Sequence, residues 1–251
     1  MRQFDIFVWG KSQEFSDKND RPPFTDPALG WFFTSNFNDK LNESDAEWIV
    51  FANSAVTIDR DFLNSLAETI SGFPMVDAFA PRLRYTCMGT DDKKSSTKFV
   101  GGFNLHKSKG IEPIEEDSPL RYVAGPRPEI AVFSRRIVQR TGAFDPSIPI
   151  PAQILDYALR MLHAGGRCFS VPYLVAGLQG IPLDFSSENR ECLPHIAYAL
   201  SKSLGIKTAR FVAMHPSVMA SLWKKRKSLQ EKRDKAIRLS KLTPETLKEL
   251  Y

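Results

Sequence analysis

The stretch that most constrains the fold of this chain is a short apolar run followed by a polar tip and an amphipathic pattern. Residues 47–52 read Glu-Trp-Ile-Val-Phe-Ala, which is typical of a buried strand. The run stops at Asn53 and Ser54, and residues 59–70 then carry apolar side chains at helical spacing, with Gly72 as a stop signal. A strand, a tip and a helix in this order predict an α/β sheet, and ligands bind open sheets of this kind at the carboxyl ends of the strands.

Other short apolar runs extend the predicted sheet. Residues 4–9 are rich in aromatic and β-branched side chains and predict a first strand, which Gly10 ends. The early strands alternate with helices, whereas the later strands follow one another without full crossover helices, so we expect a mixed sheet flanked by helices. The later predicted strands are residues 76–79, 99–105, 122–124, 130–133 and 168–171, and the predicted helices among them are residues 134–141 and 152–164.

The last quarter of the chain has a different pattern. From residue 191 onward it is helical, with predicted helices at residues 196–204 and 208–219 and then a basic segment. We therefore expect two parts: residues 1–190 form a ligand-binding α/β domain, and residues 191–251 form a helical C-terminal extension with a basic tail.

The net charge of the protein is concentrated in that tail. The 251 residues carry a formal charge of +5, but residues 224–251 alone carry ten basic and four acidic side chains. Residues 1–223 are therefore nearly neutral, at −1. A neutral body argues against a nucleic-acid binder, whose surface is broadly basic, so we expect no nucleic-acid partner.

Two further features bear on location and on metal binding. No apolar run reaches the roughly 18 to 20 residues of a membrane-spanning helix, and the first residues lack a secretory signal, so we expect a cytoplasmic protein. Three widely spaced cysteines, Cys87, Cys168 and Cys192, predict no disulfide framework, and the four histidines lack metal-ligand spacing.

The strand-and-tip segment also carries a resemblance to a known family. Residues 45–63 resemble the family 2-like glycosyltransferases of the GT-A fold, in which such a strand ends in an Asp-x-Asp motif before a helix. Residues 125–145 resemble that family's strand, arginine-containing helix and Gly-x-Phe-Asp segment. Residues 156–167 resemble its Asp-x-x-x-Arg helix that ends in Ala-Gly, and Val171-Pro172 follows at the family's position. The resemblance spans residues 45–175 and implies a GT-A-like, Rossmann-like mixed sheet.

This sequence departs from the family pattern at the acidic positions. In the family, the two carboxylates of Asp-x-Asp hold a divalent cation, and here Asn53 and Ala55 occupy those positions. Because Mg²⁺ and Mn²⁺ need anionic oxygen ligands, we assign neither ion to this tip, and the resemblance leaves one of them open as a cofactor. The family's Glu-Asp pair, which supplies the catalytic base, falls at Gln153 and Ile154, and Asp156 is the acid that remains.

Three interpretations of these departures stay open. The protein is a metal-independent enzyme in which Arg127, Arg135 or Arg82 offsets the phosphate charge. Alternatively, it is a degenerate domain that kept a binding cleft and lost catalysis. In the third interpretation the alignment is shifted, and the acid lies at Asp59 or Asp156.

The resemblance implies a set of site residues. Asp156 is the predicted catalytic base, and Trp9, Asn36, Asn53, Ser54 and Arg127 are the predicted donor-binding residues. Asp17 or Asp26 is a further candidate for contact with a base or ribose. Each has a simpler interpretation as well: Asp156 as a helix carboxylate, Arg127 as a solvated loop residue, and Asn53-Ser54 as a plain turn.

The implied function is transfer of a sugar from a nucleotide-sugar donor to a glycan or lipid-linked acceptor, in surface polysaccharide biosynthesis. The alternative is a non-catalytic binding or scaffolding domain of a glycan-assembly system. A thin apolar stripe begins just before the tail, residues 224–251, runs among its cations, and consists of Leu222, Leu229, Ala236, Ile237, Leu239 and Leu242. A helix of this kind suits an anionic membrane surface at the inner face of the membrane. Alternatively, that stripe packs on the body or on a second copy in a homo-oligomer.

Overall fold

The structure is a computed structural model in which residues 2–10, 26, 28–88, 95–106, 110–114, 119–184, 193–204, 216–238 and 240 are described. Asp17, Cys192, residues 208–215 of the predicted helix at 208–219, and most of residues 239–251 lie outside these ranges. Within them, no helix is long and apolar enough to cross a membrane.

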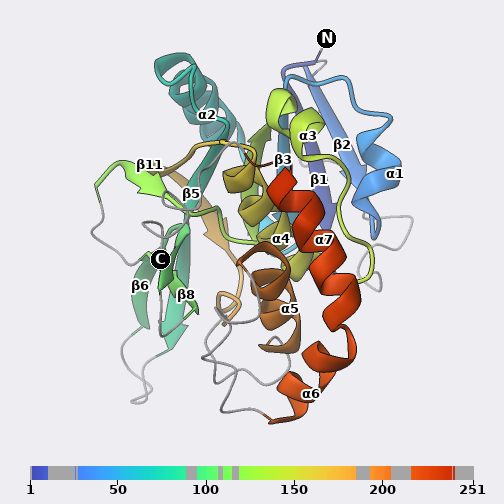
Figure 1. Cartoon of the computed structure of the whole chain (residues 1–251). Coiled ribbons are helices and arrows are strands. Elements are labelled where there is room, and N and C mark those ends of the chain that lie inside the picture. The colour runs from blue at the N-terminus through green and yellow to red at the C-terminus, as the bar shows by residue number, and fades with distance from the viewer. Residues whose placement is uncertain are drawn as a thin grey trace.

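A mixed sheet forms the centre of the molecule, as the sequence predicts (Figure 1). In the order β2-β1-β3-β10-β5-β11-β4 the strands are Leu29–Phe33, Phe4–Trp9, Trp48–Asn53, Ile130–Ser134, Ala78–Met88, Cys168–Leu178 and Val56–Thr57. Strands β2, β1 and β3 are parallel to one another, and β10 runs antiparallel to its neighbours β3 and β5. Two more strands pair off this path: β6 (Ser95–Val100) with β5, and β9 (Arg121–Val123) with β11.

The central strands are apolar on both faces because helices cover the sheet on both sides. Ile6 and Val50 belong to the cluster on one face, and Phe7 and Phe51 belong to the cluster on the other. Helix α2 (Arg60–Gly72) packs on the first face, and its first turn is capped by Asp59 Oδ1, which accepts from the Phe62 amide at 2.8 Å. We call the other side the α4 face. It is covered by α1 (Phe37–Leu41), α3 (Arg135–Thr141) and α4 (Ile150–His163).

Three strand boundaries differ from the sequence-based expectation. The run at residues 99–105 is not one strand, since β6 ends at Val100 and β7 begins at Phe103 after two glycines. Strand β7 (Phe103–His106) pairs instead with β8 (Gly110–Pro113) in a small separate sheet. Strand β5 continues to Met88, and β11 runs past Pro172 because the β5–β11 ladder is interrupted there by a bulge.

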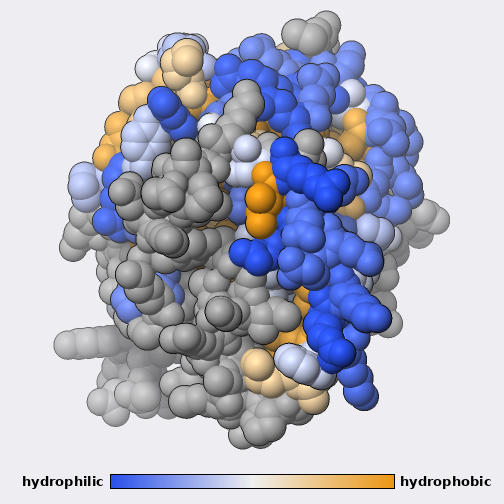
Figure 2. Space-filling view, in the orientation of Figure 1, coloured by the Kyte–Doolittle hydropathy of each residue, from blue (hydrophilic) through white to orange (hydrophobic). Residues whose placement is uncertain are grey.

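The C-terminal helices pack against the outer side of α4. They are α5 (Leu193–Leu204), α6 (Pro216–Lys224) and α7 (Arg226–Arg238). Leu222 and Leu229, two members of the predicted apolar stripe, are 2% and 1% exposed in a cluster with Leu193 and Ala197. This part of the stripe is therefore buried against the body of the protein. The outward side of α7 forms a hydrophilic band (Figure 2).

Candidate functional site

The carboxyl ends of β1 and β3 meet at the polar tip, which we define as Asn53, Ser54 and Ala55. Trp9 is the register partner of Asn53. The Ser54 amide donates to the Trp9 carbonyl at 2.7 Å, and the Asn53 amide donates to the Glu129 carbonyl at 2.8 Å. The fold therefore brings three of the predicted donor-binding residues, Trp9, Asn53 and Ser54, to one edge of the sheet.

The side chain of Asn53 closes a turn at this tip. Its Oδ1 accepts from the Ala55 amide at 2.9 Å, which is an Asx turn. Because this oxygen is already engaged and neutral, and Ala55 offers no side-chain ligand, the tip is poorly suited to hold a divalent cation. Among the described residues, no group of three or more His, Cys, Asp or Glu side chains is placed to hold a metal ion.

The neighbouring residues of β1 are tightly packed on the tip. A Cβ on Gly10 would collide with the Ser54 side chain, so glycine permits the close approach of the two strand ends. Trp9 is 7% exposed, and its indole Nε1 is buried without a hydrogen-bond partner in the described structure. An unsatisfied buried donor at a ligand-binding edge is consistent with a contact that a ligand completes.

The other predicted contacts on the N-terminal side are placed less favourably. Asn36 is exposed beyond β2, but it caps α1: its Oδ1 accepts from the Asn38 amide at 3.1 Å, and its Nδ2 donates to Asp39 at 2.8 Å. Asp26 precedes β2, at the amino end of the strand and hence at the edge opposite the tip. Its Oδ1 accepts from the Ala28 amide at 2.9 Å.

Arg127 lies close to the tip in a buried ion pair. It is 4% exposed, and its Nη2 donates to Glu129 Oε1 at 2.8 Å and to the Leu183 carbonyl at 2.6 Å. The Leu183 amide in turn donates to Glu129 Oε1 at 2.6 Å. Arg127 is therefore not a solvated loop residue, and its charge is offset by Glu129. The pair fastens the segment around Leu183 beside the tip.

The other two arginines that the sequence offers for phosphate charge lie at different edges. Arg135 follows Ser134, which pairs with Trp48 at the amino end of β3, so Arg135 is far from the tip. Its guanidinium bonds to Ala46 and Ser44 there. Val132 of β10 pairs with Val50 of β3 on one side and with Phe79 of β5 on the other. Asn53 lies three residues beyond Val50, and Arg82 lies three residues beyond Phe79. Arg82 is thus level with the tip.

Arg82 also lies on the same face of the sheet as Asn53. Two residues before each of them in the strand, Ala80 and Phe51 belong to the core cluster of the α4 face. The Arg82 guanidinium lies 5.5 Å from the centre of the Phe99 ring, and its Nη1 makes a long, 3.5 Å contact with the Pro172 carbonyl. Of the three arginines, this half-buried one is best placed to meet negative charge near the tip.

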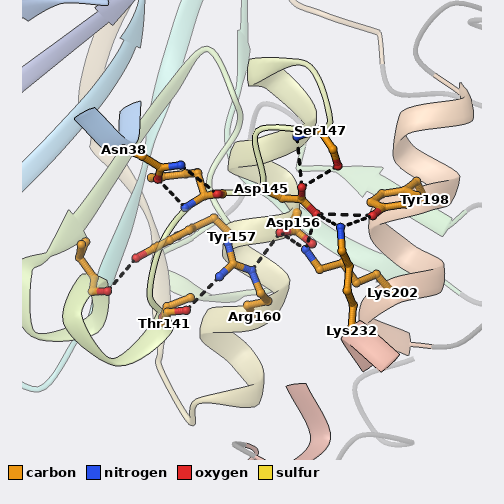
Figure 3. A network of polar contacts seen from close by, with 12 residues as sticks. Asn38, Thr141, Asp145, Ser147, Asp156, Tyr157, Arg160, Tyr198, Lys202 and Lys232 are labelled. Atoms are coloured by element: carbon orange, nitrogen blue, oxygen red, sulfur yellow. Dashed lines mark hydrogen bonds and ion pairs between the residues drawn. The ribbon is translucent and has the colours of Figure 1, made fainter. Parts of the chain in front are cut away.

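Asp156 lies in a buried ionic network on the far side of α4 (Figure 3). The carboxylate is 0% exposed, and its Oδ2 accepts from Arg160 Nε at 2.9 Å and from Lys202 Nζ at 3.0 Å. Its Oδ1 is buried without a partner among the described atoms. In this conformation Asp156 faces α5 and is closed to solvent, away from the tip.

The same network continues to Asp145, which joins three elements (Figure 3). Ser147, Lys202 and Lys232 all donate to this carboxylate, at 2.6, 3.0 and 2.9 Å. Burial by itself raises the pKa of Asp145, but these hydrogen bonds and the Lys202 charge outweigh it and hold the pKa well below its usual range. Lys232 also donates to Tyr198 at 2.7 Å. Sequence reasoning missed this network because its members lie on separate segments.

The remaining titratable or polar groups of α4 offer no exposed base. Burial lowers the pKa of His163, whose Nε2 contacts the Ser203 carbonyl at 2.8 Å, so the ring is neutral. Burial also raises the pKa of Tyr157 strongly. Gln153 bonds to the Ile148 carbonyl at 2.8 Å, and Ile154 is fully buried. The two positions that match the family's Glu-Asp pair are therefore neutral and enclosed.

Comparisons with known proteins identify the fold. No protein-family model and no curated protein sequence matches the chain. GalNAc-T7, solved with UDP, GalNAc and Mn²⁺, is similar in structure with a TM-score of 0.62 at 9% identity, over 94% of this chain and 54% of that one. This chain thus spans about half the length of that protein.

Two further solved structures are similar at lower scores. The mannosyltransferase PcManGT from Pyrobaculum calidifontis, in complex with GDP-Man and Mn²⁺, has a TM-score of 0.45 at 13% identity, over 100% of this chain and 85% of that one. Residues 1–349 of S. aureus TarS with UDP-GlcNAc have a TM-score of 0.43 at 11% identity, over 99% and 83%. The likeness to GalNAc-T7 shows the fold: this chain has the GT-A fold, as its sequence predicts.

Proposed function

We propose that the protein is a glycosyltransferase that takes its sugar from a nucleotide-sugar donor bound at the carboxyl edge of β1 and β3. The observation that carries the proposal is the convergence of Trp9, Asn53 and Ser54 at that edge, within a GT-A fold. The exposed Ser54 side chain supplies a polar contact for a donor. The Trp9 indole Nε1, which is buried without a partner among the described atoms, would supply a second one once the packing over it opens. Ligands bind open α/β sheets at this edge.

The proposed transfer does not use a metal ion held by the tip. Asn53 and Ala55 provide no carboxylate, and the Asn53 oxygen is engaged in its own turn. Negative charge on the departing diphosphate would be met by Arg82, which is level with the tip and half-buried. A role for Arg127 as predicted from the sequence requires that it leave Glu129.

The assignment of Asp156 as catalytic base stays a prediction. A general base must come within hydrogen-bond reach of the acceptor hydroxyl. In the described conformation Asp156 would become accessible only if Lys202 and α5 moved away from it. Asp156→Asn should abolish transfer without altering donor affinity if the assignment holds. Equal losses of stability and of both activities would instead indicate a structural role.

A second candidate function is a non-catalytic domain that binds a nucleotide-sugar or a glycan within an assembly system. It is favoured by the enclosure of both predicted charged site residues, Arg127 and Asp156, in buried ion pairs. Fold alone does not decide between an enzyme and a binding domain.

One experiment separates the two candidates. We would titrate the protein with UDP-, GDP-, dTDP- and CMP-sugars by calorimetry, with EDTA and with Mn²⁺, and assay donor hydrolysis in parallel. Binding and turnover that persist in EDTA support the proposed metal-independent transferase. Turnover that needs Mn²⁺ contradicts metal independence, donor binding without turnover favours the binding domain, and no donor binding at all contradicts the proposal.

We also propose an acceptor and a location for the protein. The acceptor is a glycan or lipid-linked glycan of a surface polysaccharide, and the protein works at the cytoplasmic face of the membrane. Support comes from a cationic patch around Trp223, which is 62% exposed and stacks with Arg226 at 4.6 Å. Lys224, Lys225 and Lys227 are exposed next to it. An exposed tryptophan among cations suits an anionic lipid surface.

A further inference from the structure

The α4 face of the sheet continues past the tip onto exposed strand residues. Thr57 of β4 pairs with Gly177 of β11, and Gly177 pairs with Arg84 of β5. Residues paired directly across strands place their side chains on one face. Thr86, two residues after Arg84, pairs with Thr97 of β6, so both of these hydroxyls belong to the same face.

The opposite face of these strands belongs to the core. Leu83 and Val100, which alternate with the residues above, are 0% and 7% exposed and pack in the cluster beneath α2. Arg84, Thr86 and Thr97 are exposed. The hydroxyl and guanidinium groups are therefore directed away from the α2 core, on the side that also carries Arg82.

This surface contains a groove at Gly177, a residue without a side chain. The groove has a volume of about 220 Å³, and Gly177 forms part of its lining together with Thr57, Arg84, Thr86, Thr97 and Gln179. Among the described residues, a Cβ on Gly177 would meet only Thr57, at ordinary contact distances of 3.7 and 3.9 Å. Glycine is thus not required by the local backbone packing, and its effect is to leave the floor of the groove open.

The groove is continuous with the candidate site. Thr57 follows the tip residue Ala55 by two positions, and the Gln179 amide donates to the Ala55 carbonyl at 2.9 Å. On the other side, Arg84 follows Arg82 by two positions on the same strand. A ligand lying in the groove would therefore extend directly toward the tip.

The lining predicts the chemistry of that ligand. Hydroxyl and amide groups from three threonines and Gln179 can exchange hydrogen bonds with sugar hydroxyls. A guanidinium binds carboxylate or phosphate through two parallel hydrogen bonds. The groove is smaller than the roughly 300 to 1,000 Å³ of sites that enclose a whole small ligand. It would hold one segment of a longer chain.

We propose that this groove binds a segment of an acidic glycan, with Arg84 on its carboxylate or phosphate group and the threonines and Gln179 on its hydroxyls. As the acceptor site of a transferase, the groove rests on the proposed function. Glycan binding itself needs no donor, so the two can fail independently.

The test measures glycan binding to the full chain without any donor. The probes are uronic acid oligosaccharides, phosphorylated mannose oligosaccharides and their neutral counterparts, each titrated by calorimetry. Arg84→Gln removes the cation, and Gly177→Val fills the groove with a residue that suits a strand. Lys98→Gln is the matched control, because Lys98 is an exposed cation of β6 whose partner Tyr85 belongs to the other face.

We expect an acidic probe to bind better than its neutral counterpart, and Arg84→Gln to weaken it about tenfold or more, as for other hydrogen bonds to charged groups. Gly177→Val should weaken acidic and neutral probes alike, and Lys98→Gln should change affinity less than twofold. Preference for the uronic acid or the phosphorylated probe identifies the source of the anion. Failure of every probe to bind, or unchanged affinity in Gly177→Val, overturns the proposal. Glycan binding that needs Arg84 in a protein without donor binding overturns the transferase function and leaves the groove in place.

Discussion

At the scale of single residues, the chemistry of the site depends on which polar atoms the fold has already engaged. The side-chain oxygen of Asn53 accepts a hydrogen bond within its own turn, and Glu129 neutralises Arg127. Asp156 is ion-paired with Arg160 and Lys202. Arg82 and Arg84, by contrast, lie on the α4 face of the sheet, Arg82 level with the tip and Arg84 two residues beyond it. The residues that the family motif singles out are thus mostly structural, and the two cations that the α4 face offers to a ligand near the tip lie on β5.

One residue that the packing requires is Gly125, between β9 and β10. A Cβ there would lie 2.6 Å from Ala158 Cβ of α4 and 2.7 Å from the Phe103 ring. We expect Gly125→Ala to lower the free energy of unfolding by about 1 to 3 kcal/mol, because neither neighbour can withdraw without moving its element. Urea unfolding measures the change.

Gly72, near the end of α2, is the matched control for that substitution. No atom of the described part of the chain lies within 4 Å of a Cβ at this position, so Gly72→Ala should be neutral or slightly stabilising. A Gly125→Ala variant as stable as the unsubstituted protein would mean that α4 does not approach this loop so closely.

At the scale of elements, α7 is a part of the folded body. Leu229 is 1% exposed in the cluster beneath α7, whereas Ile237 on the same helix is 43% exposed. We expect Leu229→Ala to cost about 2 to 5 kcal/mol of unfolding free energy, as buried leucines do, and Ile237→Ala to cost much less. Thermal unfolding of the two variants compares them, and equal effects would place α7 off the body.

The ionic contacts of α7 give this docking a dependence on pH. The pKa of Asp145 is lowered in the folded protein, so its contribution is complete above the ordinary carboxyl value of about 3.9 and is lost as the pH falls below it. The pKa of Lys232 is raised, because its bonds to Tyr198 and Asp145 outweigh burial. Its contribution is therefore complete below about pH 10.4 and is lost above that value.

Asp145→Asn tests this pH dependence. We expect the variant to be about 1 to 2 kcal/mol less stable at pH 7, because it weakens the hydrogen bonds that the two lysines make to this carboxylate. The difference in unfolding free energy between the variant and the unsubstituted protein should shrink below about pH 4. There the Asp145 carboxylate of the unsubstituted protein is protonated when the chain unfolds. Asp234→Asn is the control, because Asp234 is a half-buried carboxylate of α7 that accepts a hydrogen bond from Gln230 of its own helix, at 2.9 Å. A difference that is constant down to pH 2 would contradict the assignment.

At the scale of the whole molecule, the basic tail and the neutral body are parts of one structure. The described section of the tail buries Leu229 against the body, next to Leu222 of α6, so this part of the stripe cannot enter a membrane unless α7 leaves the body. What remains for a surface is the cationic patch around Trp223 and the hydrophilic band of α7 (Figure 2).

The membrane proposal therefore predicts a superficial, salt-sensitive association. Vesicles containing phosphatidylserine should sediment with the protein at low ionic strength, and vesicles of phosphatidylcholine alone should not. Replacing Lys224, Lys225 and Lys227 with glutamine should abolish the association, at about 1 kcal/mol per basic residue. Binding that persists in about 1 M salt, where surface charges are screened, would contradict it.

Much of the fold was predictable from local pattern. The apolar runs of β1, β3 and β10 and the stripe of α4 carry the period of their own secondary structure, so their positions follow from sequence alone. Helix α5 was also predicted, whereas the predicted helix at residues 208–219 coincides with α6 only from Pro216 to Met219 within the described ranges. The extension of β5 and β11 was not, since their outer residues are polar and pair only because neighbouring strands hold them.

The sequence by itself determined a mixed α/β sheet with a polar tip, because both depend on the order of short apolar runs and on residue types at one strand end. The GT-A fold was predicted from the resemblance of residues 45–175 to a known family. Only the tertiary structure decided the environment of each charge. Arg82 and Asn53 are 29 positions apart, and Asp156 and Lys202 are 46 apart, as the numbering gives. Their placement depends on how strands pair and helices dock across the whole chain. These contacts cannot be predicted from the local sequence, because they are set by the packing of the complete core.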